Sequence, residues 1–102
     1  MDAEKREVLS LLTEDLYNPH EIALWVPVGR RELARILDQL LREGLAEWYI
    51  RDNDSAPAVP LSELQVPIPD LADDETWIVT DLRSRQLLLG ATRKGETEYY
   101  GE

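Results

Sequence analysis

Four arginines between residues 30 and 42 are the side chains of this sequence best suited to binding a partner. A guanidinium group is planar and always charged, and it pairs bidentately with a phosphate or with the edge of guanine. At about 100° per residue, Arg31, Arg35 and Arg42 lie on one exposed side of a helix. The candidate DNA contacts in this stretch are therefore Arg30, Arg31, Arg35 and Arg42. The alternative is a solvated helix face on which Asp38 pairs with Arg35 and Arg42.

A second basic stretch lies nearer the C-terminus. Residues 82–95 contain Arg83, Arg85, Arg93 and Lys94 and no acid. Arg83 and Arg85 are candidate contacts to the DNA backbone that flanks the bases read by a helix. The alternative interpretation is ordinary surface charge.

Acidic residues dominate the rest of the chain, whose formal net charge is −10. That charge opposes nonspecific attraction to nucleic acid, so any DNA binding depends on where basic side chains gather. Residues 52–75 contain seven acids and no base. This acidic loop is a candidate docking surface for a basic protein partner, through Asp70, Asp73 and Asp74, or a cover for the third helix.

The same acids are poor candidates for catalysis or metal binding. Asp73, Asp74 and Glu75 have no nucleophile or phosphate-cradling glycines nearby, and His20 is the only histidine of the chain. A metal site or an acid–base pair needs more groups of the right kind. We therefore expect no enzymatic activity, no catalytic residue, no cofactor and no metal ion.

The large aromatic residues divide into two groups. Trp25, Trp48 and Trp77 are expected in the core, because large aromatics dominate small cores. Tyr99 and Tyr100 are candidate contacts of a homodimer or of another partner, because tyrosine joins apolar area to a polar tip. Packing of a terminal strand on the body is the alternative for this pair.

Helical periodicity and capping signals predict the elements that position these residues. A first amphipathic helix spans about residues 3–16. A short second helix begins at Asn18 and Pro19 and buries Ile22, Ala23 and Trp25. The third helix begins near Gly29 or Arg30, carries an apolar stripe and ends before Gly44, and a strand follows over residues 45–50. The apolar residues of this third helix are Leu33, Ile36, Leu37, Leu40 and Leu41.

The order of a short helix, a turn, the run RRELARILDQLLREGLAE and a strand resembles the helix-turn-helix core and first wing strand of winged-helix domains. It is most similar to bacterial regulators of the MarR and PadR type. The resemblance covers about residues 15–50 and, more weakly, Ile78-Val79-Thr80-Asp81, which is similar to the strand end that precedes the next helix in those regulators. It implies a third helix in the major groove of double-stranded DNA and a possible homodimer.

The chain departs from this pattern after Ile50. The stretch 51–75 contains four of the six prolines, interspersed with apolar residues, which predicts a long ordered loop lying against the body. Two interpretations remain for the last residues. One is a helix over 81–89; the other, slightly favoured, is a meander with strands 76–81, 86–92 and 97–100.

One domain covers residues 1–102: a helix-turn-helix core (about 3–50), the acidic proline-rich loop (about 51–75) and C-terminal strands or a short helix (about 76–100). The expected fold class is α+β, a winged helix. A charged N-terminus, the lack of a long apolar run and the absence of cysteine predict a cytoplasmic protein without membrane contact. The resemblance to the regulators implies a bacterial or phage-like protein. The expected function is a DNA-binding transcriptional regulator; the alternative is an acidic protein-interaction module that does not bind DNA.

Overall fold

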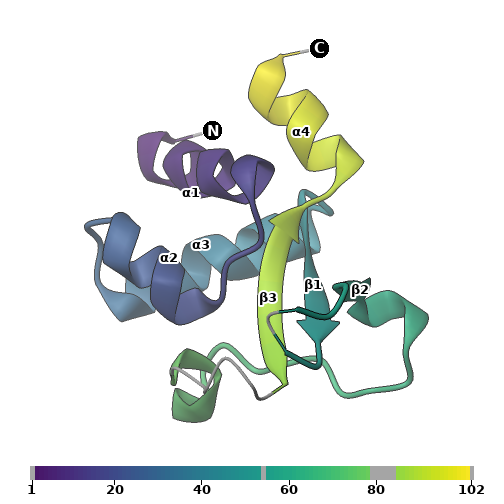
Figure 1. Cartoon of the computed structure of the whole chain (residues 1–102). Helices are drawn as coiled ribbons and strands as arrows, with labels where there is room; N and C mark the ends of the chain where they lie inside the picture. Colours follow the sequence, from purple (N-terminus) through teal and green to yellow (C-terminus); the bar gives the residue numbers. More distant parts are fainter. Residues whose placement is uncertain (1, 54, 79–84, 102) are drawn as a thin grey trace.

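Three helices, a three-stranded antiparallel sheet and a C-terminal helix make up the computed structural model, which describes residues 2–53, 55–78 and 85–101 (Figure 1). The elements in chain order are α1 (Ala3–Glu14), α2 (Pro19–Trp25), α3 (Arg30–Arg42), β1 (Ala46–Arg51), β2 (Val59–Pro60), the 3-10 helices η1 (Leu61–Glu63) and η2 (Asp74–Trp77), β3 (Gln86–Ala91) and α4 (Arg93–Tyr100). The expected α+β class is confirmed, and the arrangement is compatible with a winged-helix-like fold.

The helix boundaries follow from capping side chains close to the predicted positions. Asn18 accepts a hydrogen bond from the Glu21 backbone N–H, and the Glu21 carboxylate accepts one from the Asn18 N–H, which together form a capping box. Gly44 has a φ of 75°, the left-handed conformation that ends α3. These local signals set the direction in which each helix enters the core.

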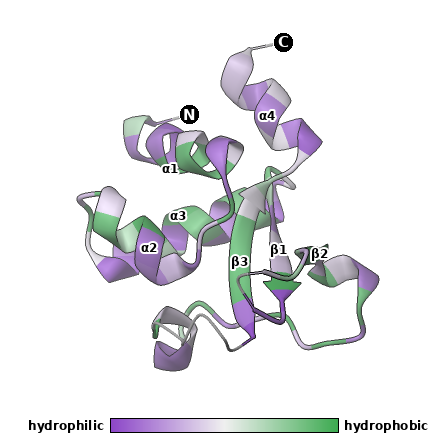
Figure 2. Cartoon of the chain, viewed as in Figure 1, coloured by the Kyte–Doolittle hydropathy of each residue, from purple (hydrophilic) through white to green (hydrophobic). Residues whose placement is uncertain are grey.

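The core lies between the helices and one face of the sheet. The predicted stripe of α3 is buried at Leu33, Ile36, Leu37 and Leu40, against Val8 and Leu9 of α1 and Ile22 of α2. Figure 2 shows β3 as apolar in its middle, and this edge strand of the sheet buries Leu88 and Leu89.

The sheet has the order β2-β1-β3, with antiparallel pairs. The pairing of β1 with β3 runs from Ala46 opposite Ala91 to Arg51 opposite Gln86. Tyr17, between α1 and α2, forms an isolated bridge with Leu89, and so attaches the helical half to β3. The connection between β1 and β3 occupies the position of the wing in a winged-helix-like arrangement.

That connection is folded against the body where the structure describes it, as predicted. Val59 and Pro60 pair with β1 at the sheet edge, where proline's missing N–H is tolerated. Leu61 and Trp77 are buried, and Val66 and Leu71 pack partly against the core. We refer to residues 68–77 as the strap.

Of the three strands predicted for the C-terminal meander, the one over 86–92 is confirmed, and those over 76–81 and 97–100 are wrong where the structure describes them. Gln86–Ala91 is a strand, so a helix over 81–89 is excluded for its last four residues, while 79–84 lie outside the described residues. Residues 76 and 77 belong to η2 rather than to a strand, and 97–100 belong to α4. The Thr92 side chain caps α4 by accepting from the Gly95 N–H. The strand-to-helix junction that the structure describes lies at residues 91–95, and residues 79–81, where the resemblance predicted a strand end, lie outside the described residues.

Two core predictions in α2 are also wrong. Ile22 is fully buried, but Ala23 and Trp25 are exposed, and Val26 takes the buried position instead. At about 100° per residue, Val26 and Trp25 lie on opposite flanks of Ile22, about 40° and about 60° from it, and the core meets the flank that carries Val26.

Candidate interaction site

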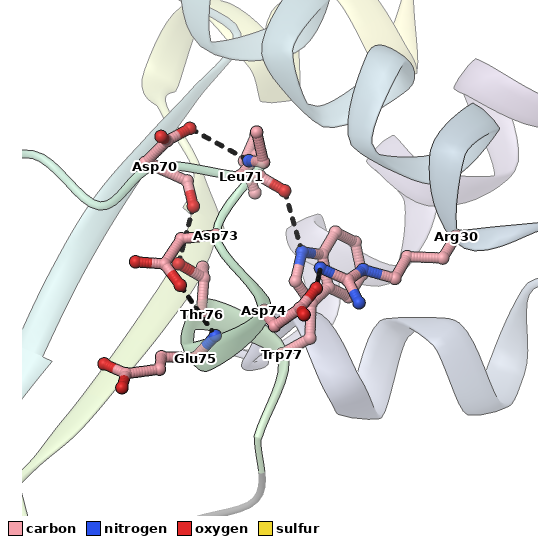
Figure 3. A network of polar contacts seen from close by, with 9 residues as sticks. Arg30, Asp70, Leu71, Asp73, Asp74, Glu75, Thr76 and Trp77 are labelled. Carbon is pink, nitrogen blue, oxygen red and sulfur yellow. Dashed lines mark hydrogen bonds and ion pairs between the residues drawn. The ribbon is translucent and has the colours of Figure 1, made fainter.

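The N-terminal end of α3 is in contact with the strap. The Arg30 guanidinium forms an ion pair with the Asp74 carboxylate at 2.7 Å, and its central carbon lies 5.3 Å from the centre of the Trp77 ring (Figure 3). Trp77 is only 8% exposed and belongs to the core cluster, whereas the Asp74 side chain is 87% exposed. Apolar burial of Trp77 therefore anchors the strap, and the ion pair adds a weak polar contact.

Hydrogen bonds within the strap hold its shape without a bound partner. The Trp77 indole N–H donates to the Leu71 carbonyl oxygen at 2.9 Å, and the Thr76 hydroxyl donates to the Asp70 carbonyl at 2.6 Å. Asp70 and Asp73 accept from backbone N–H groups two residues ahead, as in Asx turns. The predicted partner-binding acids Asp70, Asp73 and Asp74 thus lie together on an ordered turn.

The arginines of α3 share an exposed face, but neighbouring acids neutralise most of them. Arg42 pairs with Asp38 at 2.9 Å, as expected. Arg35 pairs with Glu32 rather than with Asp38, its Nε donating at 3.0 Å. This hydrogen bond lowers the pKa of Glu32 and raises that of Arg35. Within the part of the chain that the structure describes, Arg31 is the one of these four arginines without a carboxylate partner.

The second basic stretch does not form one cluster. Arg85 pairs with Asp52 across the base of the connection, at 3.5 Å. Arg93 and Lys94 belong to α4, and the Lys94 ammonium donates to the Glu43 carbonyl at the end of α3. Arg83, the remaining candidate contact to DNA, lies outside the described residues.

An open cleft of about 920 Å³ separates the outer side of α3 from the strap. Its walls mix arginines with apolar side chains, and Trp48 of β1 contributes to them. The residues along α3 are Arg30, Arg31, Ala34, Arg35, Asp38 and Leu41; those opposite are Ile68 to Ala72. The arginine face predicted from the sequence is therefore one wall of a concave surface rather than a free convex helix.

Sequence reasoning missed an exposed apolar pair on α2. Leu24 is 72% exposed and Trp25 is 67% exposed, and α2 packs against η2, the helical turn that carries Asp74 and Glu75. Large apolar side chains next to one another on a surface are a mark of a contact site. The spacing gave no signal for Trp25, because residues three apart share a helix face and its exposure depends on where the core lies relative to α2.

The two candidate tyrosines have different environments. Tyr99 is partly buried against the core, with the Arg6 guanidinium 4.7 Å from its ring centre and an Arg6 hydrogen bond to its carbonyl. Tyr100 is exposed and makes an edge-to-face contact with Tyr99. Tyr99 thus serves packing of α4 on α1, and Tyr100 is the accessible member of the pair.

The described residues contain no group of three side chains that could hold a metal ion, and no helix among them is long and apolar enough to cross a membrane. Comparison with known proteins found no match either, whether to a protein family, to a curated protein or to a solved structure.

Proposed function

We propose that the chain is a winged-helix-like protein-interaction module, with a partner surface formed by α2 and the η2 turn. The observation that carries this proposal is the exposed pair Leu24 and Trp25 on the helix that packs against η2. An aromatic anchor bordered by charged residues is the usual composition of a protein interface, and tryptophan is enriched among the residues that dominate binding energy. The carboxylates of Asp73, Asp74 and Glu75 select a basic partner.

The position of the strap favours a protein-interaction function and disfavours insertion of α3 into DNA. A major groove is about 12 Å wide and admits a helix only when its outer face is free. Here the strap lies along that side of α3, where Asp70 lines the cleft and Asp74 pairs with Arg30. Glu32 and Asp38 already occupy Arg35 and Arg42. Inserting α3 in this conformation brings acids against the DNA backbone.

A defined basic and apolar probe tests the proposal. A fluorescent peptide of alternating arginine and leucine is titrated with the protein, and its anisotropy is followed. We expect saturable binding that Trp25→Ser weakens, because the anchor is lost. The variant Asp73→Asn, Asp74→Asn, Glu75→Gln weakens it as well, because the carboxylates are neutralised while the oxygen acceptor of each Asx position is kept.

A matched control separates this surface from the charge of the whole molecule. The variant Glu7→Gln, Glu14→Gln, Glu98→Gln removes the same three charges from exposed positions of α1 and α4. The proposal requires peptide binding close to wild type in this control. Equal weakening in both triple variants means that the peptide follows net charge, and the proposed surface is then wrong.

DNA binding through α3, in the manner of the MarR and PadR regulators, is the second candidate. It is favoured by Arg31, which has no acidic partner in the described residues, and by the weakness of exposed ion pairs such as Arg42–Asp38, about 0–1 kcal/mol each. A labelled random duplex at low salt provides the test. Saturable, salt-dependent binding that Arg31→Ala with Arg35→Ala abolishes favours this candidate over the interaction module.

A further inference from the structure

The strap carries the opposite charge to the helix that it lies beside. α3 contains four arginines and two acids, a net charge of +2, whereas the strap contains four acids and no base, a net charge of −4. The two segments together are therefore negative. Attraction of phosphate groups depends on the positive charge of the local surface. The strap thus turns a helix face that attracts a polyanion into one that repels it.

The strap lies across from α3 without being packed along it. Asp74 pairs with Arg30 in the first turn of the helix, and Asp70 lines the wall of the cleft that faces α3. Ile68, on the same wall, is 77% exposed, so this wall does not close on the helix. Movement of the strap away from α3 therefore disturbs few contacts along the helix.

Few attachments hold the strap in this position. Trp77 is buried in the core, and Leu71 packs partly against the core. The Arg30 guanidinium contacts both Trp77 and Asp74 (Figure 3). In the described part of the chain, the hydrogen bonds of the strap join its residues to one another or to Ile78, and none joins it to α3. The strap is therefore a unit with its own internal structure, and Trp77 is the main anchor that its opening must release.

We propose that the strap is an autoinhibitory segment, which in its closed position keeps double-stranded DNA from the arginine face of α3. When Trp77 leaves the core, the strap acids leave with it. Arg30 then loses its carboxylate partner, and Arg31 no longer faces an opposite wall that keeps it from a groove about 12 Å wide. The closed state weakens the apparent affinity for DNA, because only the open fraction of the molecules can bind.

This inference goes beyond the proposed interaction function and does not depend on it. It makes DNA binding, the second candidate, conditional on opening of the strap. The two ideas use different surfaces, since the arginine face belongs to α3 and the exposed apolar pair belongs to α2.

Opening the strap by mutation tests the proposal without a partner. A labelled random duplex is titrated at low salt with the wild-type protein and with Trp77→Ala, and its anisotropy is followed. We expect Trp77→Ala to bind at least about tenfold more tightly, because loss of the anchor raises the open fraction. Trp77→Phe keeps an aromatic ring in the core and is expected to bind close to wild type. Circular dichroism verifies that each variant is folded.

A second pair of variants changes charge and leaves the anchor in place, so it decides the question if Trp77→Ala does not fold. Asp70→Asn with Asp74→Asn neutralises the acid that lines the cleft and the acid that pairs with Arg30, and it keeps an oxygen acceptor at each position. Glu7→Gln with Glu14→Gln removes two charges from exposed positions of α1. The strap variant is expected to bind the duplex about fivefold more tightly than wild type, and the α1 control to change by less than about twofold.

Arginine variants locate the binding in whichever strap variant is folded and binds more tightly. Added to that variant, Arg31→Gln is expected to remove most of the gain, because it deletes a charge of the uncovered face. Arg93→Gln removes one exposed arginine of α4 and is expected to keep the gain.

Three results overturn the proposal. One is duplex binding by folded Trp77→Ala that is no tighter than that of the wild type. Another is an equal gain in the strap and α1 charge variants, which means that the duplex responds to net charge. The third is a gain that Arg31→Gln leaves intact, which places the binding outside the α3 face. The peptide assay of the α2–η2 surface is read separately, so its failure together with tighter duplex binding by Trp77→Ala overturns the interaction function alone.

Discussion

Replacing Trp77 by alanine tests whether apolar burial, and not the ion pair to Arg30, holds the strap. A buried tryptophan removes on the order of 150–250 Å² from water, and truncating such a residue to alanine costs about 3–5 kcal/mol. The indole also donates to the Leu71 carbonyl at 2.9 Å, a bond worth about 1 kcal/mol net. Because the strap relaxes once its anchor is gone, we expect the lower part of this range, about 3 kcal/mol.

Two further variants separate the contribution of Trp77 burial from that of the ion pair and from loss of a tryptophan in general. Asp74→Asn breaks the ion pair with Arg30, but the carboxylate is largely exposed, so the cost is at most about 1 kcal/mol. Trp25→Ala deletes the same side chain as Trp77→Ala from a position that is 67% exposed, and it costs about 0.5 kcal/mol or less.

Urea unfolding followed by circular dichroism measures the free energy of unfolding of all three variants, and limited proteolysis measures opening of the strap. Trp77→Ala is expected to lower the free energy of unfolding most and to speed cleavage within residues 68–77. A domain of this kind is stable by about 5–15 kcal/mol, so the helical core is expected to remain folded. An Asp74→Asn effect as large as that of Trp77→Ala refutes the reasoning, since it makes the ion pair the anchor.

Three further predictions concern single positions. Gly95→Ala is expected to destabilise the protein by about 2 kcal/mol or more in urea, because a Cβ at this buried position overlaps the Leu45 carbonyl oxygen; an unchanged midpoint contradicts this packing. Gly29→Ser is expected to stabilise it by a few tenths of a kcal/mol in the same assay, because Gly29 caps α3 without a side-chain bond and has open space around it. Burial, with the charges of Glu47 and Glu96, raises the pKa of Tyr49, so the folded state resists its ionisation. Stability is therefore lost as pH rises above about 10, the pKa of an unfolded-state tyrosine, and Tyr49→Phe reduces this loss in unfolding curves measured between pH 9 and 11.

The elements with strong local signals were predictable from the sequence. The capping residues Asn18 and Glu21, the apolar stripe of α3 and the stop at Gly44 each act within a few residues, so they determine structure without long-range help. The strand over 86–91 was also predicted, because its apolar run has no helical stripe.

The helix α4 was missed because its signals depend on tertiary contacts. Gly95 is a poor helix residue by propensity, and in the folded protein it is required by the close approach of the Leu45 backbone. Thr92 both caps the helix and donates to the Gly44 carbonyl, a contact between residues 48 positions apart. Both contacts join residues that are far apart in the sequence, so local sequence patterns do not predict them.

The sequence was sufficient to predict which residues belong to the candidate site, but not which of them contact one another. The acids of the loop and the arginines of the third helix were both identified, and one stated possibility was that the loop covers the helix. Which acid meets which arginine depends on the path of the strap, and that path is set by burial of Trp77 and by the Asx turns at Asp70 and Asp73. The exposure of Trp25 follows from where the core lies relative to α2, which a single helical pattern does not specify.

Four arginines of this acidic chain form ion pairs with carboxylates of the same chain. Arg30 holds the strap acid Asp74, and Arg85 holds Asp52 at the base of the same connection. Arg35 and Arg42 each hold an acid of their own helix. Each exposed pair contributes at most about 1 kcal/mol, so these pairs add little to the stability of the fold. Among the four arginines of residues 30–42, Arg31 has no such partner in the part of the chain that the structure describes, so its charge is the one of this helix that is available to another molecule.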